Sequence, residues 1–545
     1  MKRWTWIGIL AVIAIFAWDT WQRRWISDDG LIYTRTVRQL LVGNGPVFNA
    51  FERAEANTST LWTYILFLGS AITRQESATI AVVLGGILSV TGLFVALDAT
   101  RRFYRERGHE VLLPAGVFVL LGAIPFWDFS TSGLETGLAM FWEAWAWWLL
   151  VAKKREGLTA FVLGLGPLVR PELGLMTIVF LIVSFLTIQT PKRSIWKLLA
   201  IAFAVPLAYE IFRAGYYGTL VPLPALAKSA SASAWTRGYH YLRDFAKPYA
   251  LWIPFATLAV YVIARREKKT AIGLAPVIVG VLLFVYVIRL GGDFMHGRML
   301  LPPIFIALMP VLLVPASRLA VPFVIVLVVW AGVIGTKRNK PHQSMATQEY
   351  VEDERWGYSR WTGRNHPTDP AIFARSERHA AFAFYLSYWT YGHSLVNGDQ
   401  LDWPLTAAPQ FERPVYIDGR LGTGGVVAPL DAVVADTLGL ANPLGARITP
   451  TNPGFPGHEK PLPGPWLIAQ FGALDTTWNW AAPADIAAAH HAMQCGELAE
   501  LIESTQAPMT AGRFWSNLVG SVRRTRLVIP ADAHEAERKF CNVPK

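Results

Sequence analysis

Long apolar runs separated by short polar loops fill residues 1–336, and this pattern ends at Lys337. A bilayer is crossed by a helix of about 20 mostly apolar residues, so these runs predict a polytopic α-helical membrane protein with about eleven spanning helices. Residues 337–545 are polar, rich in Trp and Pro, and contain no run of that length. The pattern therefore predicts two domains, a membrane domain of residues 1–336 and a separate domain of residues 337–545.

Basic residues favour one face of this membrane domain. Lys2 and Arg3 precede the first run, and cytoplasmic loops are the ones enriched in Lys and Arg. The run Leu61–Ile72 is too short to span, so we interpret it as an interfacial helix in the first outer loop. All strong basic clusters then fall in the cytoplasm: Arg101–Arg107, Lys153–Glu156, Pro191–Lys197 and Arg265–Lys269. An odd number of spans places the second domain outside the cell membrane.

The composition of the chain limits the kinds of molecule that the protein is expected to bind. Of the residues, 53% are hydrophobic and 16% charged, against about 25% charged in soluble domains. The net charge of +11 and the pI near 9.6 suit anionic lipid headgroups or a lipid phosphate. No nucleic-acid-binding motif accompanies this charge. The composition thus indicates a plasma-membrane protein whose partners include the bilayer.

The sequence pattern of the second domain predicts an α/β or β-rich fold. Residues Arg413–Pro429 are typical of strands joined by glycine turns, and Ala484–Ser504 of one helix. Cys495 and Cys541 are the two cysteines of the chain. An even count in an oxidising compartment predicts a disulfide, with two buried free thiols as the alternative.

An acidic pair directly follows the first apolar run. Asp28 and Asp29 lie within a few residues of the predicted membrane surface, where carboxylates are costly. Ser27 is a predicted N-cap, and the apolar residues after the pair recur at helical spacing, so we expect an amphipathic helix lying on the membrane. The functional interpretation is a catalytic pair. The alternative is that both aspartates only cap this helix.

Other polar residues gather in the same outer loops. The glycine pair at positions 291 and 292 permits close backbone approach, so the segment around Arg298 is a candidate phosphate site. No Walker loop, dinucleotide fingerprint or zinc spacing is present. The pattern favours a lipid-phosphate substrate whose reacting carbon lies just above the bilayer. The candidate side chains are the acids Asp28, Asp29, Glu135, Glu172 and Asp293 and the bases Arg170, Lys228, Arg289, His296 and Arg298.

Six motifs together resemble the GT-C fold of membrane glycosyltransferases. They are SDDGLIYTRTVRQLL, NGPVFN, NTSTLW, STSGLET, VRPE and GGDFMHGRMLLP, in this order along residues 27–302. With an outer carboxy-terminal domain, the chain resembles the actinobacterial family of terminal β-(1→2)-arabinofuranosyltransferases. YIDGRLGTGGVVAPLD, residues 416–431, is the part of the second domain that is similar to the family's carbohydrate-binding domain.

The resemblance implies a function for the chain and a role for each candidate site residue. The donor would be decaprenylphosphoryl-arabinofuranose, and the acceptor the arabinan of arabinogalactan and lipoarabinomannan. Asp29 would be the catalytic acidic residue, assisted by Asp28. The leaving phosphate would be held by cations among Arg298, His296, Lys228 and Arg289, with Asp293, Glu135 and Arg170 also in the substrate site. No cofactor is implied, and a divalent cation held by the acidic pair stays an alternative.

Two other functions remain open. One is a different GT-C transferase, such as a mannosyltransferase with a polyprenyl-phosphomannose donor. The other is a transporter of lipid-linked sugars. Against transport, the charged residues lie in loops on one face, whereas coupling sites of transporters lie near the bilayer midplane.

Overall fold

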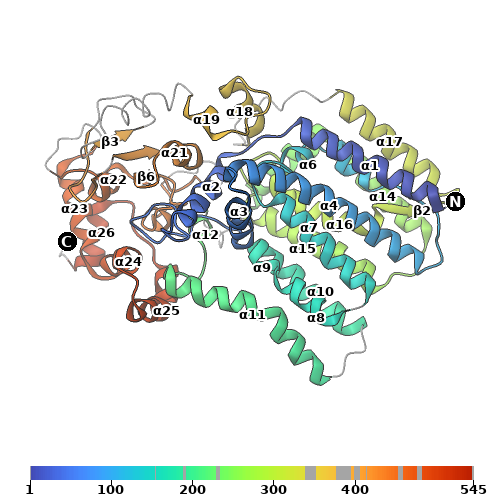
Figure 1. Ribbon diagram of the computed structural model, residues 1–545, viewed down its shortest axis with the longest axis horizontal. Helices are drawn as coiled ribbons and strands as arrows, with labels where there is room; N and C mark the ends of the chain where they lie inside the picture. Colours follow the sequence, from blue (N-terminus) through green and yellow to red (C-terminus); the bar gives the residue numbers. More distant parts are fainter. Residues whose placement is uncertain are drawn as a thin grey trace.

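The structure is a computed structural model that describes residues 2–153, 155–187, 192–228, 233–337, 351–375, 394–397, 405–412, 414–451, 458–474 and 481–542. Lys154 and Pro191, which belong to two of the basic clusters, lie outside these residues. The chain forms a bundle of apolar helices on one side and a smaller part of helices and short strands on the other (Figure 1). The apolar bundle marks the chain as a membrane protein.

The bundle is built from helices of unequal length. Four described helices are long and apolar enough to cross a membrane, namely α1 (Lys2–Gln22), α4 (Ser77–Arg105), α11 (Lys192–Tyr216, within which Ser194–Tyr216 qualifies) and α15 (Ala271–Leu290). α13 (Trp235–Tyr249) and α14 (Trp252–Arg265) pass the same test as a pair bent by 87°. The shorter apolar helices of the bundle include α7 (Thr136–Ala152), α8 (Glu156–Gly164), α10 (Gly174–Thr187), α16 (Leu301–Leu308) and α17 (Ala320–Lys337).

Several brief elements connect the longer helices. They are α5 (Val117–Gly122), α6 (Pro125–Asp128), α9 (Gly166–Val169), α12 (Leu223–Ala227) and an antiparallel strand pair, β1 (Leu112–Pro114) with β2 (Leu313–Pro315). Close packing of α4 on α7 positions the loop between α6 and α7. A Cβ on Gly137 would lie 2.2 Å from the carbonyl oxygen of Gly85, so only glycine permits this helix approach.

Two helices that follow α1 lie between the bundle and the second part, α2 (Asp28–Leu41) and α3 (Thr60–Thr73) (Figure 1). The side chain of Ser27 accepts a hydrogen bond from the Gly30 amide, which confirms the predicted N-cap. α2 does not have the open polar face that is expected of an amphipathic helix lying on a membrane. Most of its residues are buried because α3 and α4 cover one side and α21 the other.

Arg35 shows how completely α2 is covered. Its guanidinium is buried and donates hydrogen bonds to five backbone carbonyls, those of Phe48, Gly425, Ala428, Pro429 and Ala432. Four of these belong to the second part of the chain. A charge that would face water on a surface helix instead joins the two parts.

The second part contains a four-stranded sheet of order β4-β3-β5-β6. β3 (Ser394–Asn397), β5 (Val415–Asp418) and β6 (Val433–Asp436) are parallel, and β4 (Leu405–Thr406) is antiparallel to β3. The helices of this part are α21 (Leu421–Val427), α22 (Gly464–Phe471), α23 (Pro483–Met493), α24 (Gly496–Gln506), α25 (Ala511–Arg526) and α26 (Ala533–Cys541). Before them, α18 (Glu354–Thr362) and α19 (Pro370–Ala374) pack through Tyr358 and Phe373 on the core of the bundle.

Two local predictions for this part are wrong and one is confirmed. Of the described residues 414–429, β5 is the one strand; Leu421–Val427 forms α21, because Asp28 accepts hydrogen bonds from its first amides. The predicted helix Ala484–Ser504 is two helices, since Gly496, the first residue of α24, adopts a φ of +49°. Cys495 and Cys541 form the expected disulfide.

Candidate functional site

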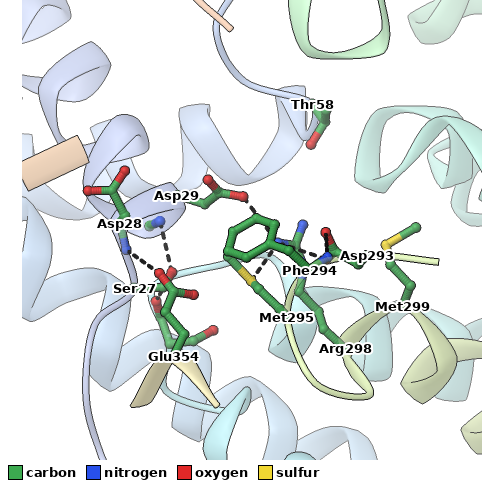
Figure 2. A network of polar contacts seen from close by, with 12 residues as sticks. Ser27, Asp28, Asp29, Thr58, Asp293, Phe294, Met295, Arg298, Met299 and Glu354 are labelled. Atoms are coloured by element: carbon green, nitrogen blue, oxygen red, sulfur yellow. Dashed lines mark hydrogen bonds and ion pairs between the residues drawn. The ribbon is translucent and has the colours of Figure 1, made fainter. Parts of the chain in front are cut away.

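Asp29 lies in the first turn of α2 with its carboxylate directed at Arg298 (Figure 2). Arg298 Nη1 donates a hydrogen bond of 3.1 Å to Asp29 and lies 3.5 Å from the carboxylate of Asp293. Arg298 follows Gly297, whose φ of +70° turns the chain back toward α2. Segments nearly 270 positions apart in sequence thus form one ion-paired cluster.

The charges around Asp29 keep it ionised. Burial by itself would raise the pKa of this carboxyl, but the positive charges of Lys228 and Arg298 outweigh burial and hold it below its ordinary value. The Nε of Arg298 is buried and has no hydrogen-bond partner among the described residues. The cluster therefore offers a fixed negative charge and a guanidinium donor still available to a ligand.

Asp28 points the other way, into the second part of the chain. Its carboxylate accepts hydrogen bonds of 2.9 and 2.7 Å from the amides of Gly422 and Thr423, at the start of α21. Burial raises the pKa of Asp28 to about 6, although these two hydrogen bonds oppose the shift. A Cβ on Gly422 would lie 1.8 Å from the Asp28 carbonyl oxygen, so this contact requires glycine. The geometry places Asp28 as a cap of α21.

A cavity of about 170 Å³ opens on one side of Asp29. Four cationic side chains line it, Arg170, Lys228, Arg237 and Arg298. Arg170 pairs with Glu135 and, at 2.5 Å, with Glu172. Tyr286 and Leu290, at the end of α15, supply part of the apolar wall of this cationic cavity. Such a lining suits a phosphate that carries an apolar chain.

A second cavity, of about 690 Å³, shares Asp29 and Lys228 with the first. Trp356, Tyr358 and Trp361 of α18 contribute aromatic side chains to this aromatic cavity. Aromatic side chains combine a flat apolar face with, in Tyr and Trp, a hydrogen-bonding edge. That combination suits sugar rings, which are apolar on their faces and polar at their rims.

Glu354 is a site residue that the sequence predictions missed. Its Oε1 accepts a hydrogen bond of 3.2 Å from the Asp28 amide, and its Oε2 is buried without a hydrogen-bond partner among the described residues (Figure 2). Burial, with Asp29 and Asp28 nearby, raises the pKa of Glu354 well above its ordinary value. The acidic run at positions 352–354, just before an aromatic helix, is the sequence signal that could have indicated it.

Two predicted cations lie elsewhere. His296 is hydrogen-bonded through Nδ1 to Asp244, at 2.6 Å, and through Nε2 to Tyr249, at 3.2 Å. Arg289 is half-buried at the end of α15, and neither residue lines either of the two cavities. Of the predicted phosphate partners, Arg298 and Lys228 are therefore the pair that the structure brings together at Asp29.

The glycine pair at 291 and 292 lies beside the cationic cavity and close to α13. A Cβ on Gly292 would lie 2.2 Å from the ring of Tyr241, and one on Gly291 2.6 Å from Arg237 Nε. Both glycines have positive φ values. Their backbone is thus pressed against α13, and Gly292 also lines the cationic cavity.

The acidic pair does not form a shared metal site in this arrangement, because its carboxylates face different partners. Among the described residues, one group of three His, Cys, Asp or Glu side chains has metal-binding spacing, His491 with Cys495 and Cys541. The two sulfur atoms of that group are bonded to each other.

Comparison with known proteins identifies relatives of the whole chain. Residues 407–538 match the model described as the AftB family C-terminal domain. A terminal β-(1→2)-arabinofuranosyltransferase of Mycobacterium tuberculosis is 35% identical, covering 96% of this chain and 95% of the relative. The chain belongs to this family. A Corynebacterium glutamicum protein of the same name is also 35% identical, covering 92% of this chain and 83% of the relative.

Membership of the arabinofuranosyltransferase family confirms the resemblance seen in the motifs and the prediction of a glycosyltransferase. The matched carboxy-terminal region contains Gly422 and Thr423, which bind Asp28. No solved structure matches the chain.

Proposed function

We propose that this protein transfers arabinofuranose from a polyprenyl-phosphate donor, decaprenylphosphoryl-arabinofuranose, to the non-reducing ends of cell-wall arabinan in arabinogalactan and lipoarabinomannan, forming terminal β-(1→2) linkages. One observation carries the proposal. Asp29, kept ionised by Lys228 and Arg298, lies in the wall shared by a cationic cavity and an aromatic cavity. The names and coverage of the relatives support the sugar and the linkage.

The cationic cavity suits the donor. A phosphodiester carries one negative charge, and guanidinium groups bind phosphate oxygens through two parallel N–H donors. Tyr286 and Leu290 lie in the last turns of α15, directly after Val281 and Val285, whose side chains are exposed on the apolar outer face of that helix. A polyprenyl chain leaving the cavity along this face would stay in an apolar environment.

The aromatic cavity suits the acceptor. It is four times larger than the cationic cavity in volume, about 690 against 170 Å³, as expected for several sugar residues rather than one phosphate. Arg420 stacks on Trp361 with its guanidinium carbon 5.0 Å from the ring centre, which fixes one wall. α18 and the loop after β5 form this wall together, so the acceptor would bind between the two parts of the chain.

In the family that the chain resembles, the donor is the β anomer, so a β-(1→2) product means net retention of the anomeric configuration. Net retention requires two inversions or an ion pair. In the covalent route, an Asp29 oxygen attacks C1 as the C1–O bond to phosphate breaks. The acceptor 2-hydroxyl then attacks C1 from the face that the phosphate left, and the Asp29–C1 bond breaks. The hydroxyl proton passes to the released phosphate monoester, whose second pKa is about 6. Asp29 returns to its ionised form.

The test is transfer by purified protein in detergent. A labelled short-chain prenylphosphoryl-arabinofuranose and a synthetic arabinan acceptor should yield a product extended by one β-(1→2)-arabinofuranose. The matching mannosyl donor should give no product. Transfer from the mannosyl donor alone would indicate another GT-C transferase, and movement of the lipid across vesicles without transfer would indicate a transporter.

The proposal includes a topology. The protein would cross the plasma membrane about eleven times, with the site and residues 337–545 outside, because the basic clusters then share the cytoplasmic face. Arg105→Cys, at the exposed end of α4, should not react with an impermeant reagent added outside whole cells, whereas Glu497→Cys in α24 should. External labelling of Arg105→Cys would overturn this orientation. The native cysteines do not interfere, because they are joined in a disulfide.

A further inference from the structure

A third cavity, of about 810 Å³, lies at the end of α4 between that helix and α7 and α8. Its lining is basic and aromatic: Arg101, Arg102, Arg105, Glu106, Trp145, Trp148, Leu149, Ala152, Arg155 and Leu158. None of these residues belongs to the site around Asp29. We refer to this cavity as the basic groove.

Asp98 holds three of the side chains that line the basic groove. Arg101 and Arg102 both donate hydrogen bonds to its carboxylate, and Trp148 Nε1 donates another of 2.9 Å. Arg102 in turn lies over the ring of Trp148, 5.0 Å from its centre. One carboxylate thus fixes two guanidinium groups and an indole while neutralising only one of the two positive charges.

The remaining charge of the groove is exposed. Arg105 and Arg155 are both exposed at its rim. Glu106, the acidic residue of the lining, lies 3.5 Å from Lys153. Four arginines therefore outnumber the two carboxylates at this place, and the groove has a net positive charge suited to an anion.

The basic groove lies far from the transfer site. Ser77, at the start of α4, donates a hydrogen bond to the Thr34 carbonyl of α2, next to the site. α4 has 29 residues, and a rise of 1.5 Å per residue places its other end about 40 Å away. That is roughly one bilayer thickness with headgroups, so the groove lies at the opposite membrane surface.

We propose that the basic groove binds the headgroup of an anionic phospholipid, with the phosphate between Arg105 and Arg155 and an acyl chain along Trp145 and Trp148. The walls of the groove are helices of the apolar bundle, and both tryptophans are half-buried, as is usual for side chains at the headgroup level. A soluble anion would use the arginines but would not cover the part of these indole rings that remains exposed. The site is distinct from that of the lipid donor and does not depend on the proposed reaction.

The experiment is native mass spectrometry of the full chain in detergent, titrated with dioleoylphosphatidylglycerol or dioleoylphosphatidylcholine. Wild-type protein should bind the anionic lipid at least about tenfold more tightly than the zwitterionic one. Arg105→Gln with Arg155→Gln should remove most of this preference, a loss of roughly tenfold, because each basic side chain near a lipid surface contributes substantially. Arg105→Lys with Arg155→Lys should keep most of it.

Lys268→Gln with Lys269→Gln is the matched control. These lysines are exposed in the loop after α14, at the same membrane surface, since neighbouring Arg265 stacks on Tyr104 of α4. The control should change the preference by less than about twofold. An equal loss of lipid preference in both double variants would mean that the preference comes from the overall charge of this surface, and would overturn the proposal. Equal binding of the two lipids by wild-type protein would also overturn it. Displacement of phosphatidylglycerol by inorganic phosphate would instead indicate a site for free anions and overturn it too.

Discussion

Asp28 and Asp29 are consecutive residues whose carboxylates serve different partners. Asp28 accepts hydrogen bonds from the amides that begin α21, and Asp29 accepts one from Arg298 (Figure 2). Successive side chains on a helix project about 100° apart, so side chains from one turn of α2 can contact both parts of the chain. Of the two interpretations of the pair in sequence, we therefore propose catalysis for Asp29, whereas Asp28 acts as a cap, although of α21 rather than of its own helix.

Asp29→Asn should lower turnover by roughly two to four orders of magnitude or more, because the amide is a poor nucleophile at C1 and cannot supply the negative charge that the reaction needs. Donor binding should persist, since the phosphate would be held by Lys228 and Arg298. Asp28→Asn should cause a smaller loss. Single-turnover transfer and donor titration measure the two quantities separately. Normal turnover in Asp29→Asn would refute the assignment.

Arg298→Ala should weaken donor binding by about tenfold to a hundredfold and also slow transfer, since a charge-assisted contact to phosphate acts before and during the reaction. Arg289→Ala is the matched control, because this arginine at the end of α15 lines neither cavity. It should leave the donor Kd within about twofold. A comparable loss in both variants would mean that the donor phosphate is held elsewhere.

Gly422→Ala should destabilise the contact between α2 and α21. The added methyl group would lie 1.8 Å from the Asp28 carbonyl oxygen, so one helix must move. Overpacking of this kind costs about 1–3 kcal/mol, measurable as a lower Tm. Gly335→Ala in α17 is the control, because its Cβ would meet nothing within 4 Å. An unchanged Tm in Gly422→Ala would show that α21 is not rigidly docked.

The stability contributed by Asp28 should depend on pH. Because burial raises its pKa from 3.8 to about 6, the folded protein binds this proton more tightly than the unfolded chain does. The contribution of Asp28 is therefore most favourable below about pH 4 and decreases as the pH rises through 6. The Tm of Asp28→Asn, which lacks this titration, should rise relative to wild type between pH 4 and pH 7. A constant difference would contradict the pKa shift.

Local pattern was enough to predict the features that arise within one segment of the chain. Apolar runs predicted the helical membrane protein, Ser27 the start of α2, and the cysteine count the disulfide. The motifs were sufficient to recognise the family, because each is a run of neighbouring residues that can be recognised before the fold is known. Asp29, Arg298 and Lys228 could be named as candidates from the outer loops on the basis of residue type alone.

The folded chain, by contrast, determines which of these residues meet. Arg298 reaches Asp29 across 269 positions, whereas His296, two residues earlier, is paired with Asp244, and no local pattern distinguishes these outcomes. The helix α21 forms in a glycine-rich stretch because Asp28 satisfies its first amides, a long-range hydrogen bond that offsets weak helix propensity. Glu354 acquires its raised pKa only from burial beside Asp28 and Asp29. Contacts between distant segments set these properties, and periodicity carries no information about them.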